Sequence, residues 1–179
     1  MIEVSRPSPM AAAYRDRRIL LVGGTGFLGS VTLSLLLHRL PDIERLHLVL
    51  RRRPGLTAER RFFDRILPGV PFQPLRERFG QEELARLLQE RVRVLEGDLA
   101  HPMLGLSEQE QAELQGNLDL VINCSGLVDF HAPLERAYRV NILGTRHLIE
   151  LCRATGAALV HTSTAFVAGT RGGRVREVI

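Results

Sequence analysis

Short apolar runs alternate along the chain with longer stretches in which apolar residues recur every three or four positions, and turn residues separate them. The short runs favour buried strands and the longer stretches favour helices. Strands are therefore predicted at residues 18–22, 46–50, 92–95, 118–124 and 158–162, with helices over 27–40 and 133–155. Strands that alternate with helices are typical of an α/β fold. We predict a doubly wound parallel sheet that stops after about five strands.

Two segments lie outside this alternation. Residues 51–90 are charged and contain four prolines, so two or more short helices are expected there. Residues 1–16 contain no apolar stretch typical of a signal peptide and are expected to form a disordered lead-in. Ser107 and Glu110 have the spacing of a capping box, which predicts a short helix reaching about residue 115. The expected domain covers residues 17–179.

Composition narrows the class of protein. Hydrophobic residues make up 45% and charged residues 25% of the 179 positions, as in an ordinary globular domain. Aromatics are only 5% and tryptophan is absent, which argues against nucleic acid as a partner. No window approaches the roughly 18 apolar residues of a membrane helix. Cys124 and Cys152 have no disulfide or metal-site spacing, so a cytoplasmic protein without a metal is expected.

The first predicted strand and the first predicted helix are joined by a glycine-rich turn with glycines at 23, 26 and 29. In such a turn Gly23 permits the tight bend, Gly26 lets the backbone approach a pyrophosphate, and Gly29 allows close helix packing. The following helix offers free N–H groups to phosphates. A loop that merely turns the chain is the alternative, but the strand, the spacing and the helix together favour a Rossmann-type dinucleotide site.

The end of the second strand predicts which dinucleotide binds. An acidic residue there would bond the ribose of NAD, but this chain has Arg51, Arg52 and Arg53, which account for much of its net charge of +4. A guanidinium can pair with a 2'-phosphate and stack on adenine, so NADPH or NADP+ is the expected cofactor. Arg51 is the first candidate and Arg52 the second, while at least one of the three is expected to be a solvated surface residue.

Further candidates end the third and fourth strands, on the ligand-binding edge of an open sheet. Asp98 either accepts from the exocyclic amine of adenine or serves only as a turn former. The fourth strand ends in Asn123, Cys124, Ser125 and Gly126, where small residues leave room for a cofactor ribose.

Motifs in a fixed order carry a family resemblance: the turn at 23–29, Gly97-Asp98-Leu99, the segments 104–107 and 141–145, and Ser163-Thr164-Ala165-Phe166-Val167. Over residues 18–169 the chain resembles the extended short-chain dehydrogenase/reductases, and more narrowly the fatty acyl-CoA reductases. Carrier-protein thioester reductases share most of these motifs. The resemblance implies an NADPH-dependent oxidoreductase of lipid metabolism that reduces acyl-CoA to an aldehyde or alcohol by hydride transfer.

The resemblance also implies roles for particular residues. It makes Thr164 the catalytic hydroxyl that stabilises the carbonyl oxygen, with Ser163 as the nearby alternative; a polar strand end is the plain interpretation of both. The cofactor-binding residues that it implies are Gly23, Thr25, Gly26, Phe27, Leu28, Gly29, Arg51, Asp98, Leu99 and Asn141.

Three departures from the family pattern stand out. Val22 replaces a usual threonine, and Cys124-Ser125-Gly126 replaces paired alanines. More seriously, the tyrosine of the Tyr-x-x-x-Lys pair is missing, because Tyr14 and Tyr138 are followed four positions later by Arg18 and Ile142. We therefore expect the N-terminal part of a longer reductase, inactive by itself. Its last strand would lie on a sheet edge, half covered and prone to self-association.

Two other interpretations stay open beside an acyl-CoA reductase or its carrier-protein counterpart. One is a non-catalytic NADP(H)-binding module that has lost the tyrosine and lysine. The other is a nucleotide-sugar epimerase or dehydratase, which shares the glycine turn but normally has an acidic residue after the second strand and lacks so long an insert.

Overall fold

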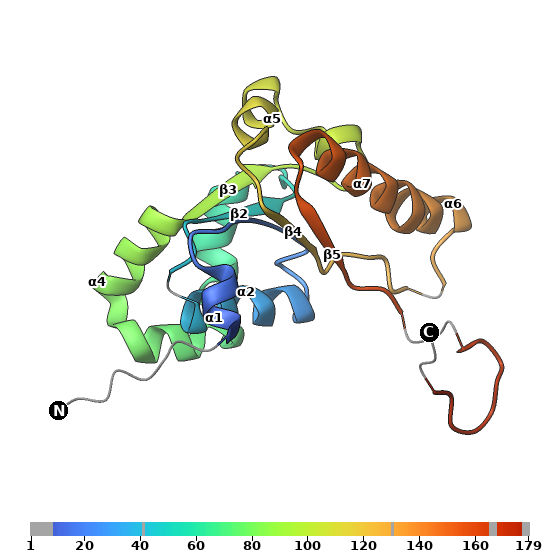
Figure 1. The fold of residues 1–179 in the computed structure, drawn as a ribbon, viewed down its shortest axis with the longest axis horizontal. Helices are drawn as coiled ribbons and strands as arrows, with labels where there is room; N and C mark the ends of the chain where they lie inside the picture. The colour runs from blue at the N-terminus through green and yellow to red at the C-terminus, as the bar shows by residue number, and fades with distance from the viewer. Residues whose placement is uncertain (1–8, 41, 130, 165–167, 177–179) are drawn as a thin grey trace.

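The sheet of the molecule has five parallel strands. The computed structural model describes residues 9–40, 42–129, 131–164 and 168–176. The strands are β1 (Arg18–Val22), β2 (Arg45–Leu50), β3 (Val92–Glu96), β4 (Leu120–Asn123) and β5 (Ala158–His161). Their order is β3-β2-β1-β4-β5, and every neighbouring pair is parallel (Figure 1). This confirms the predicted sheet, and its topological switch point falls between β1 and β4, where open α/β sheets bind ligands.

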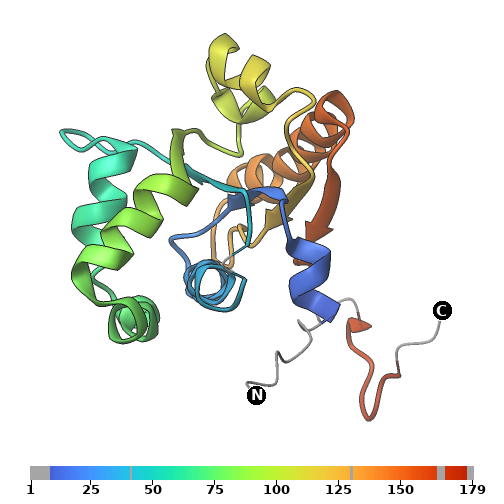
Figure 2. The same cartoon turned by 60° about the vertical axis from the view of Figure 1, so that its left-hand side comes forward.

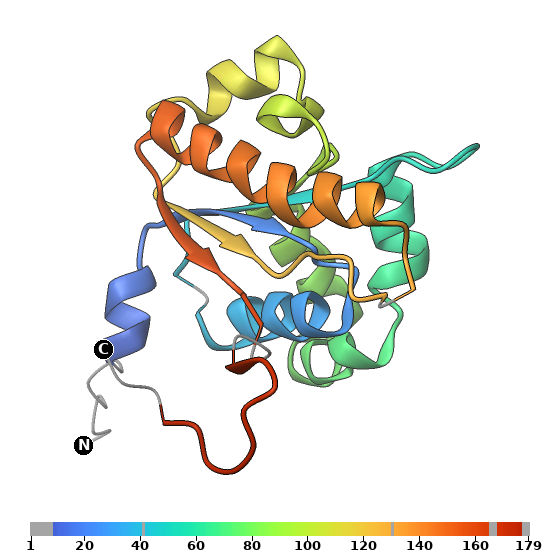
Figure 3. The same ribbon diagram turned by 90° about the vertical axis from the view of Figure 1, so that its right-hand side faces the viewer.

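Helices cover both faces of the sheet. One face holds α2 (Phe27–Arg39), and the other holds α6 (Leu134–Ala137), η4 (Tyr138–Leu143) and α7 (Gly144–Thr155) (Figure 3). Because side chains alternate along a strand, Ile19 and Leu21 of β1 join the core under α2, whereas Leu20 and Val22 join the core under α7. The two cores hold the carboxyl ends of the strands in fixed positions.

The long segment after β2 forms a group of helices that packs beside α2 (Figure 2). It contains α3 (Ala58–Arg61), the π-helix η1 (Phe62–Ile66), η2 (Val70–Phe72) and α4 (Gln73–Arg91). The expected short helices are present, but the segment also contains one long helix, α4, with 19 residues. This helix is kinked at Gly80, whose φ is 68°. Pro74 does not break α4, because it lies in the first turn, where a missing N–H costs nothing.

Two further expectations need correction or refinement. Residues 9–14 were expected to be disordered but form the helix α1 (Pro9–Tyr14), whose Ala11 and Tyr14 pack against the core under α2; residues 1–8 lie outside the described residues. The single helix expected over 133–155 is helical but changes from α6 through the π-helical η4 to α7. The Ser107–Glu110 capping box is confirmed, and it begins α5 (Glu108–Leu114).

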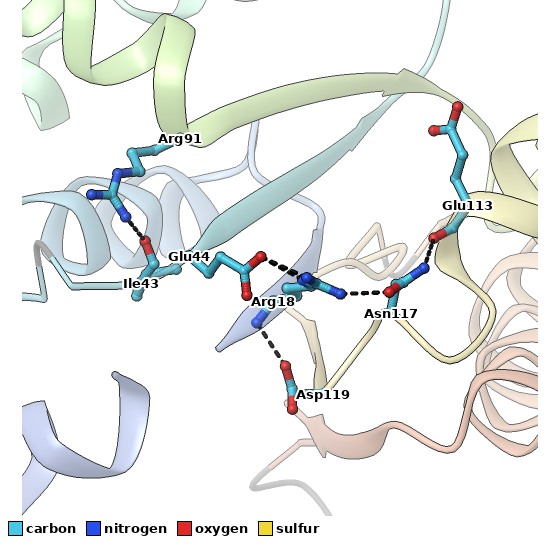
Figure 4. Close-up of polar contacts among 7 residues, drawn as sticks. All are labelled: Arg18, Ile43, Glu44, Arg91, Glu113, Asn117 and Asp119. Atoms are coloured by element: carbon cyan, nitrogen blue, oxygen red, sulfur yellow. Dashed lines mark hydrogen bonds and ion pairs between the residues drawn. The ribbon is translucent and has the colours of Figure 1, made fainter. Parts of the chain in front are cut away.

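Polar contacts close the amino ends of the strands (Figure 4). The Arg18 guanidinium contacts Glu44 at 2.6 Å and Asn117 at 2.5 Å, and the Arg18 backbone N–H donates to Asp119 at 2.8 Å. This backbone hydrogen bond, with Arg17, lowers the pKa of the Asp119 carboxyl. The opposite, carboxyl end of the sheet is the end that opens into cavities.

The sheet edge at β5 is half covered, as expected, since the side chain of Val160 is 50% exposed. In the described part of the chain, every helix is too short or too polar to cross a bilayer.

Candidate dinucleotide-binding site

Two connected cavities open at the carboxyl ends of the strands. A narrow cleft of about 230 Å³ lies over the glycine turn and is lined by Gly23, Thr25 and Gly26. A wide cavity of about 620 Å³ lies beyond the ends of β2 and β3. The two share Arg51, Gly97, Asp98 and Arg136, so a single extended ligand can occupy both.

The glycine turn is shaped by two steric requirements. Gly23 has φ of 87°, and a Cβ there would lie 2.5 Å from the backbone nitrogen of Ser125. A Cβ on Gly29 would collide with the carbonyl of Gly23. Gly29 therefore lets the first turn of α2 pack closely against the glycine turn. From the sequence we expected it to let the helix pack against the sheet.

Gly26 differs from the other two glycines because the fold does not need it. Its φ of −78° and ψ of 171° suit any residue, and a Cβ there would meet only the Gly23 oxygen at 3.5 Å. Gly26 also lines the cleft and begins α2, whose first turn carries no acidic residue. Open space and free N–H groups at one point fit a phosphate group.

Residues next to the glycines divide into two groups. Thr25 lines the narrow cleft. Phe27 and Leu28 do not line either cavity, and the Phe27 side chain is 87% exposed. Their predicted cofactor contacts would therefore come from the backbone of the first helical turn.

Arginines dominate the wide cavity. Arg51, Arg52 and Arg53 follow β2 and all three line it. Arg52 contacts Glu96 at 4.0 Å. Over the described ranges, the guanidinium groups of Arg51 and Arg53 have no carboxylate partner.

The structure adds two arginines that the sequence analysis missed. Arg61 of α3 lines the narrow cleft and donates to the Arg51 backbone oxygen at 3.0 Å. Burial and the charges of Arg53 and Arg51 lower the pKa of Arg61. Arg136 of α6 lines both cavities, and no carboxylate in the described part of the chain pairs with it. Both residues lie far from the glycine turn in sequence, so only the fold brings them there.

These five residues, Arg51, Arg52, Arg53, Arg61 and Arg136, form an arginine cluster around the cavities. Glu96 and Asp98 are the acidic residues among the lining side chains. The cluster therefore carries excess positive charge, and an anion with several phosphates would relieve the repulsion between its guanidinium groups.

Asp98 and Leu99 follow β3 as predicted. Asp98 lines both cavities, while its Oδ1 accepts from the Ala100 backbone N–H at 3.0 Å, so the turn-forming hydrogen bond is present. The predicted adenine contact would use its remaining acceptor capacity. Leu99 is buried and lines the narrow cleft, and its carbonyl contacts His147 Nδ1 at 3.0 Å.

The end of β4 contributes backbone and supporting side chains. Ser125 and Gly126 line the narrow cleft, but Asn123 is 1% exposed and lies beneath it. Asn141 is also a supporting residue, since its side chain accepts from the Leu127 N–H at 2.7 Å and donates to the Leu127 carbonyl at 3.0 Å. The side chains of Asn123 and Asn141 thus hold the loop after β4 in place by hydrogen bonds.

Ser163 and Thr164 lie just after β5 and are exposed. Neither lines the two cavities, and the rest of their motif, residues 165–167, lies outside the described residues. Their catalytic role stays a prediction.

A parallel sheet with a glycine turn at its switch point and two connected, cation-rich cavities defines a dinucleotide-binding protein of the Rossmann type. Comparison with known proteins gives the family. The chain belongs to the NAD-binding family described as male sterility protein, which matches residues 21–179.

Individual relatives agree with this family. The chain is 29% identical over 172 residues to fatty acyl-CoA reductase wat of Drosophila melanogaster, covering 92% of this chain and 31% of that protein. It is 29% identical over 155 residues to fatty acyl-CoA reductase 1 of Homo sapiens, covering 86% of this chain and 29% of that protein. The chain thus spans about a third of the length of these relatives.

A solved structure with a similar fold is the terminal R domain from the myxalamid PKS-NRPS biosynthetic pathway. The TM-score is 0.65 at 32% identity, over 84% of this chain and 35% of that chain. These findings confirm the resemblance to fatty acyl-CoA reductases and place a nicotinamide cofactor in the family's chemistry.

Proposed function

We propose that this chain is the NADPH-binding part of a fatty acyl-CoA reductase. The observation that carries the proposal is the arginine cluster, which faces the same continuous space as the glycine turn. NADPH differs from NADH by a 2'-phosphate, and a cation-rich cavity distinguishes the two where a carboxylate would favour NADH. The named relatives are fatty acyl-CoA reductases, which supports an acyl thioester as substrate.

The two cavities suggest how the cofactor lies. The wide cavity would take the adenosine with its 2'-phosphate, where Arg51 and Arg52 can pair with the phosphate and Asp98 can accept from adenine. The glycine turn would take the pyrophosphate in the narrow cleft. The nicotinamide would then extend past Ser125 toward the end of β5.

When bound here, NADPH would supply the hydride for reduction of a thioester carbonyl. The contribution of this chain to that step would be a hydroxyl, from Thr164 or Ser163, that donates to the carbonyl oxygen and stabilises its growing negative charge. The chain has no tyrosine followed by lysine four positions later to deliver the proton. By itself it is therefore expected to bind cofactor without turning over an acyl thioester.

A calorimetric titration of the chain with NADPH and NADH tests the cofactor, and incubation with NADPH and an acyl-CoA tests turnover. We expect NADPH to bind at least tenfold more tightly than NADH, with no cofactor oxidation. Equal affinities would remove the arginine cluster from cofactor selection, and a folded chain that binds neither dinucleotide would reject the proposal.

A carrier-protein-bound thioester is the second candidate substrate, favoured by the 32% identity to the R domain. Comparing an acyl-CoA with the same acyl group on a carrier protein, in a protein that carries this chain with the tyrosine and lysine, separates the two. Retained NADPH binding without reduction of either donor would instead support a non-catalytic NADP(H)-binding module.

The edge strand β5 is a candidate for self-association, because its outer backbone groups have no strand partner in the described sheet and Val160 is half exposed. Light scattering over a concentration series tests this, and a constant monomer mass would exclude it.

A further inference from the structure

Asn123 lies at the centre of a hydrogen-bonded group that links β4, β5 and the narrow cleft. Its Oδ1 is 3.0 Å from the Ser125 backbone nitrogen and 2.6 Å from the Ser125 hydroxyl. Its Nδ2 is 3.0 Å from Nδ1 of His161. Asn123 and His161 are direct partners in the register of the two strands, so the sheet itself holds them together.

The direction of each hydrogen bond follows from the chemistry of the groups. A backbone N–H can only donate, so the Asn123 atom that faces Ser125 must be the amide oxygen. The amide nitrogen then faces His161, and since an amide NH2 only donates, His161 Nδ1 must accept. Asn123 is 1% exposed, so a wrong orientation would leave buried polar atoms without partners.

This arrangement decides what the Ser125 hydroxyl can offer to a ligand. Its hydrogen is used in the bond to Asn123, so only its lone pairs remain for the cleft that Ser125 lines. Lone pairs repel phosphate oxygens, which carry no hydrogen at neutral pH. The partner must be a donor. On the nicotinamide half of the dinucleotide the donors are the ribose hydroxyls and the carboxamide NH2, and the ribose is the nearer of the two to the pyrophosphate that the glycine turn would hold.

The position of β4 decides which ribose is involved. Ser125 lines the narrow cleft but not the wide, arginine-rich cavity. In the sheet, β4 lies on the opposite side of β1 from β2 and β3, whose ends carry Arg51 and Asp98. The hydroxyl therefore faces the part of the ligand that lies away from the 2'-phosphate.

We propose that the Ser125 hydroxyl accepts a hydrogen bond from the nicotinamide-side ribose, and that His161 is a positioning residue that fixes this hydroxyl through Asn123. The proposal rests on the proposed function, because it takes NADPH as the ligand.

The test compares two ligands, NADPH and adenosine 2',5'-bisphosphate, which has the adenosine and its 2'-phosphate but no nicotinamide ribose. We expect Ser125→Ala to weaken NADPH binding about three- to tenfold, the loss of one hydrogen bond, and to leave the bisphosphate affinity unchanged. His161→Leu should act in the same way. His161→Gln should restore NADPH binding, because its amide oxygen can accept from Asn123.

His38→Leu serves as a matched control, since His38 lies in the last turn of α2, away from the cleft, and should change neither affinity. Equal losses of both ligands in Ser125→Ala would mean a merely structural role and would overturn the inference. Unchanged NADPH binding in Ser125→Ala would overturn it while leaving the proposed function intact. Failure of the unaltered chain to bind either ligand would instead overturn both.

Discussion

The two sides of the cleft recognise a ligand by different physical means. On the side of β2 and β3, Arg51, Arg52 and Arg53 line the wide cavity, where the acidic residues are Glu96 and Asp98. On the side of β4 and β5, uncharged groups are held by short hydrogen bonds around Asn123. The arginine side offers charge that acts over several ångströms, whereas the neutral side offers single hydrogen bonds that depend on exact placement.

The affinity for the ligand and the orientation of the ligand should therefore depend on different sides of the site. Charge-assisted contacts to phosphates are about twice as strong as neutral hydrogen bonds, so the arginine side should supply most of the binding free energy. The neutral side should determine how the far end of the ligand is oriented, at a smaller cost in affinity when it is altered. Between them lies the glycine turn, which both sides require.

The largest expected effects come from the glycine turn, because it supports both sides. Gly29→Val forces a side chain into the Gly23 carbonyl and should lower the free energy of unfolding by about 3 kcal/mol. Gly26→Val should leave that free energy nearly unchanged, since its backbone conformation suits valine, yet abolish binding of NADPH and NADH. Urea unfolding and calorimetric titration of the two variants measure these effects.

A folded Gly26→Val variant with normal titrations would remove the turn from the site. Gly55→Val is unsuitable as a control because of its positive φ, whereas Gly172→Ala, with open space around its Cβ, should change neither quantity.

The next largest effect should appear on the arginine side alone. Replacing Arg51 and Arg52 together by alanine should weaken NADPH binding by at least about 100-fold, because hydrogen bonds to charged groups contribute roughly 1.5–3 kcal/mol each. NADH binding should change only slightly, since NADH lacks the 2'-phosphate. Removing Arg52 also leaves Glu96 without its ion-pair partner beside the phosphate, which adds repulsion.

Parallel titrations with the two dinucleotides measure the contrast. Arg171→Ala, an exposed arginine distant in sequence from the cluster, is the control. Equal losses of NADPH and NADH would contradict a 2'-phosphate contact and would weaken the contrast between the two sides.

A third prediction concerns the buried support of the arginine side. His47 lies in the middle of β2, 8% exposed, and its Nδ1 has no hydrogen-bond partner in the described structure. Burial lowers the pKa of His47 from 6.5 to about 4, with further lowering by Arg93 and Arg45, an opposing contribution from Glu113 and the smallest contribution, again lowering, from Arg18. The folded chain therefore takes up this proton at lower pH than the unfolded chain.

Protonation of His47 consequently favours unfolding. Its contribution to stability is complete above pH 6.5 and is lost as the pH falls toward 4, by about 2 kcal/mol at pH 5. Urea unfolding at pH 7.5 and pH 5 should show this slope in the unaltered chain and a shallower one in His47→Leu. The exposed His131→Gln is the control. Identical slopes in the unaltered chain and His47→Leu would mean that the buried ring is not protonated on unfolding.

Local patterns predicted the fold well because its strands are short apolar runs. β1 was predicted with its observed bounds, and the other strand bounds differ by at most two residues at either end. The helix α1 was missed because its sequence, PMAAAY, lacks amphipathic spacing and gains its order from the contacts of Ala11 and Tyr14 with the core. The length of α4 was missed because prolines were taken as breaks, although Pro74 lies in the first turn of the helix.

The candidate site was predicted only where its residues adjoin a strand end. The glycine turn, Arg51, Asp98 and Ser125 could be found because parallel strands end at one edge of the sheet. Arg61 and Arg136 are ordinary surface arginines in the sequence, and tertiary packing alone brings them to the cleft. The backing roles of Asn123 and Asn141 were also beyond sequence patterns, since a motif does not show which way an amide side chain points.

The smallest expected effect tests whether the arginine side extends across the cleft. Arg136 reaches the cavities from α6, which follows β4, so it belongs by sequence to the neutral side and by charge to the arginine side. It is exposed, and an exposed charge contact contributes only about 0.2–1 kcal/mol, so Arg136→Ala should weaken NADPH binding about two- to fivefold. The loss should shrink at high salt because screening reduces exposed interactions. The neighbouring Arg139→Ala, which lines neither cavity, should have no effect in the same titration. A salt-independent loss would mean that Arg136 packs against the ligand rather than attracting it by charge. The side that binds by charge would then be limited to the residues that follow β2 and β3.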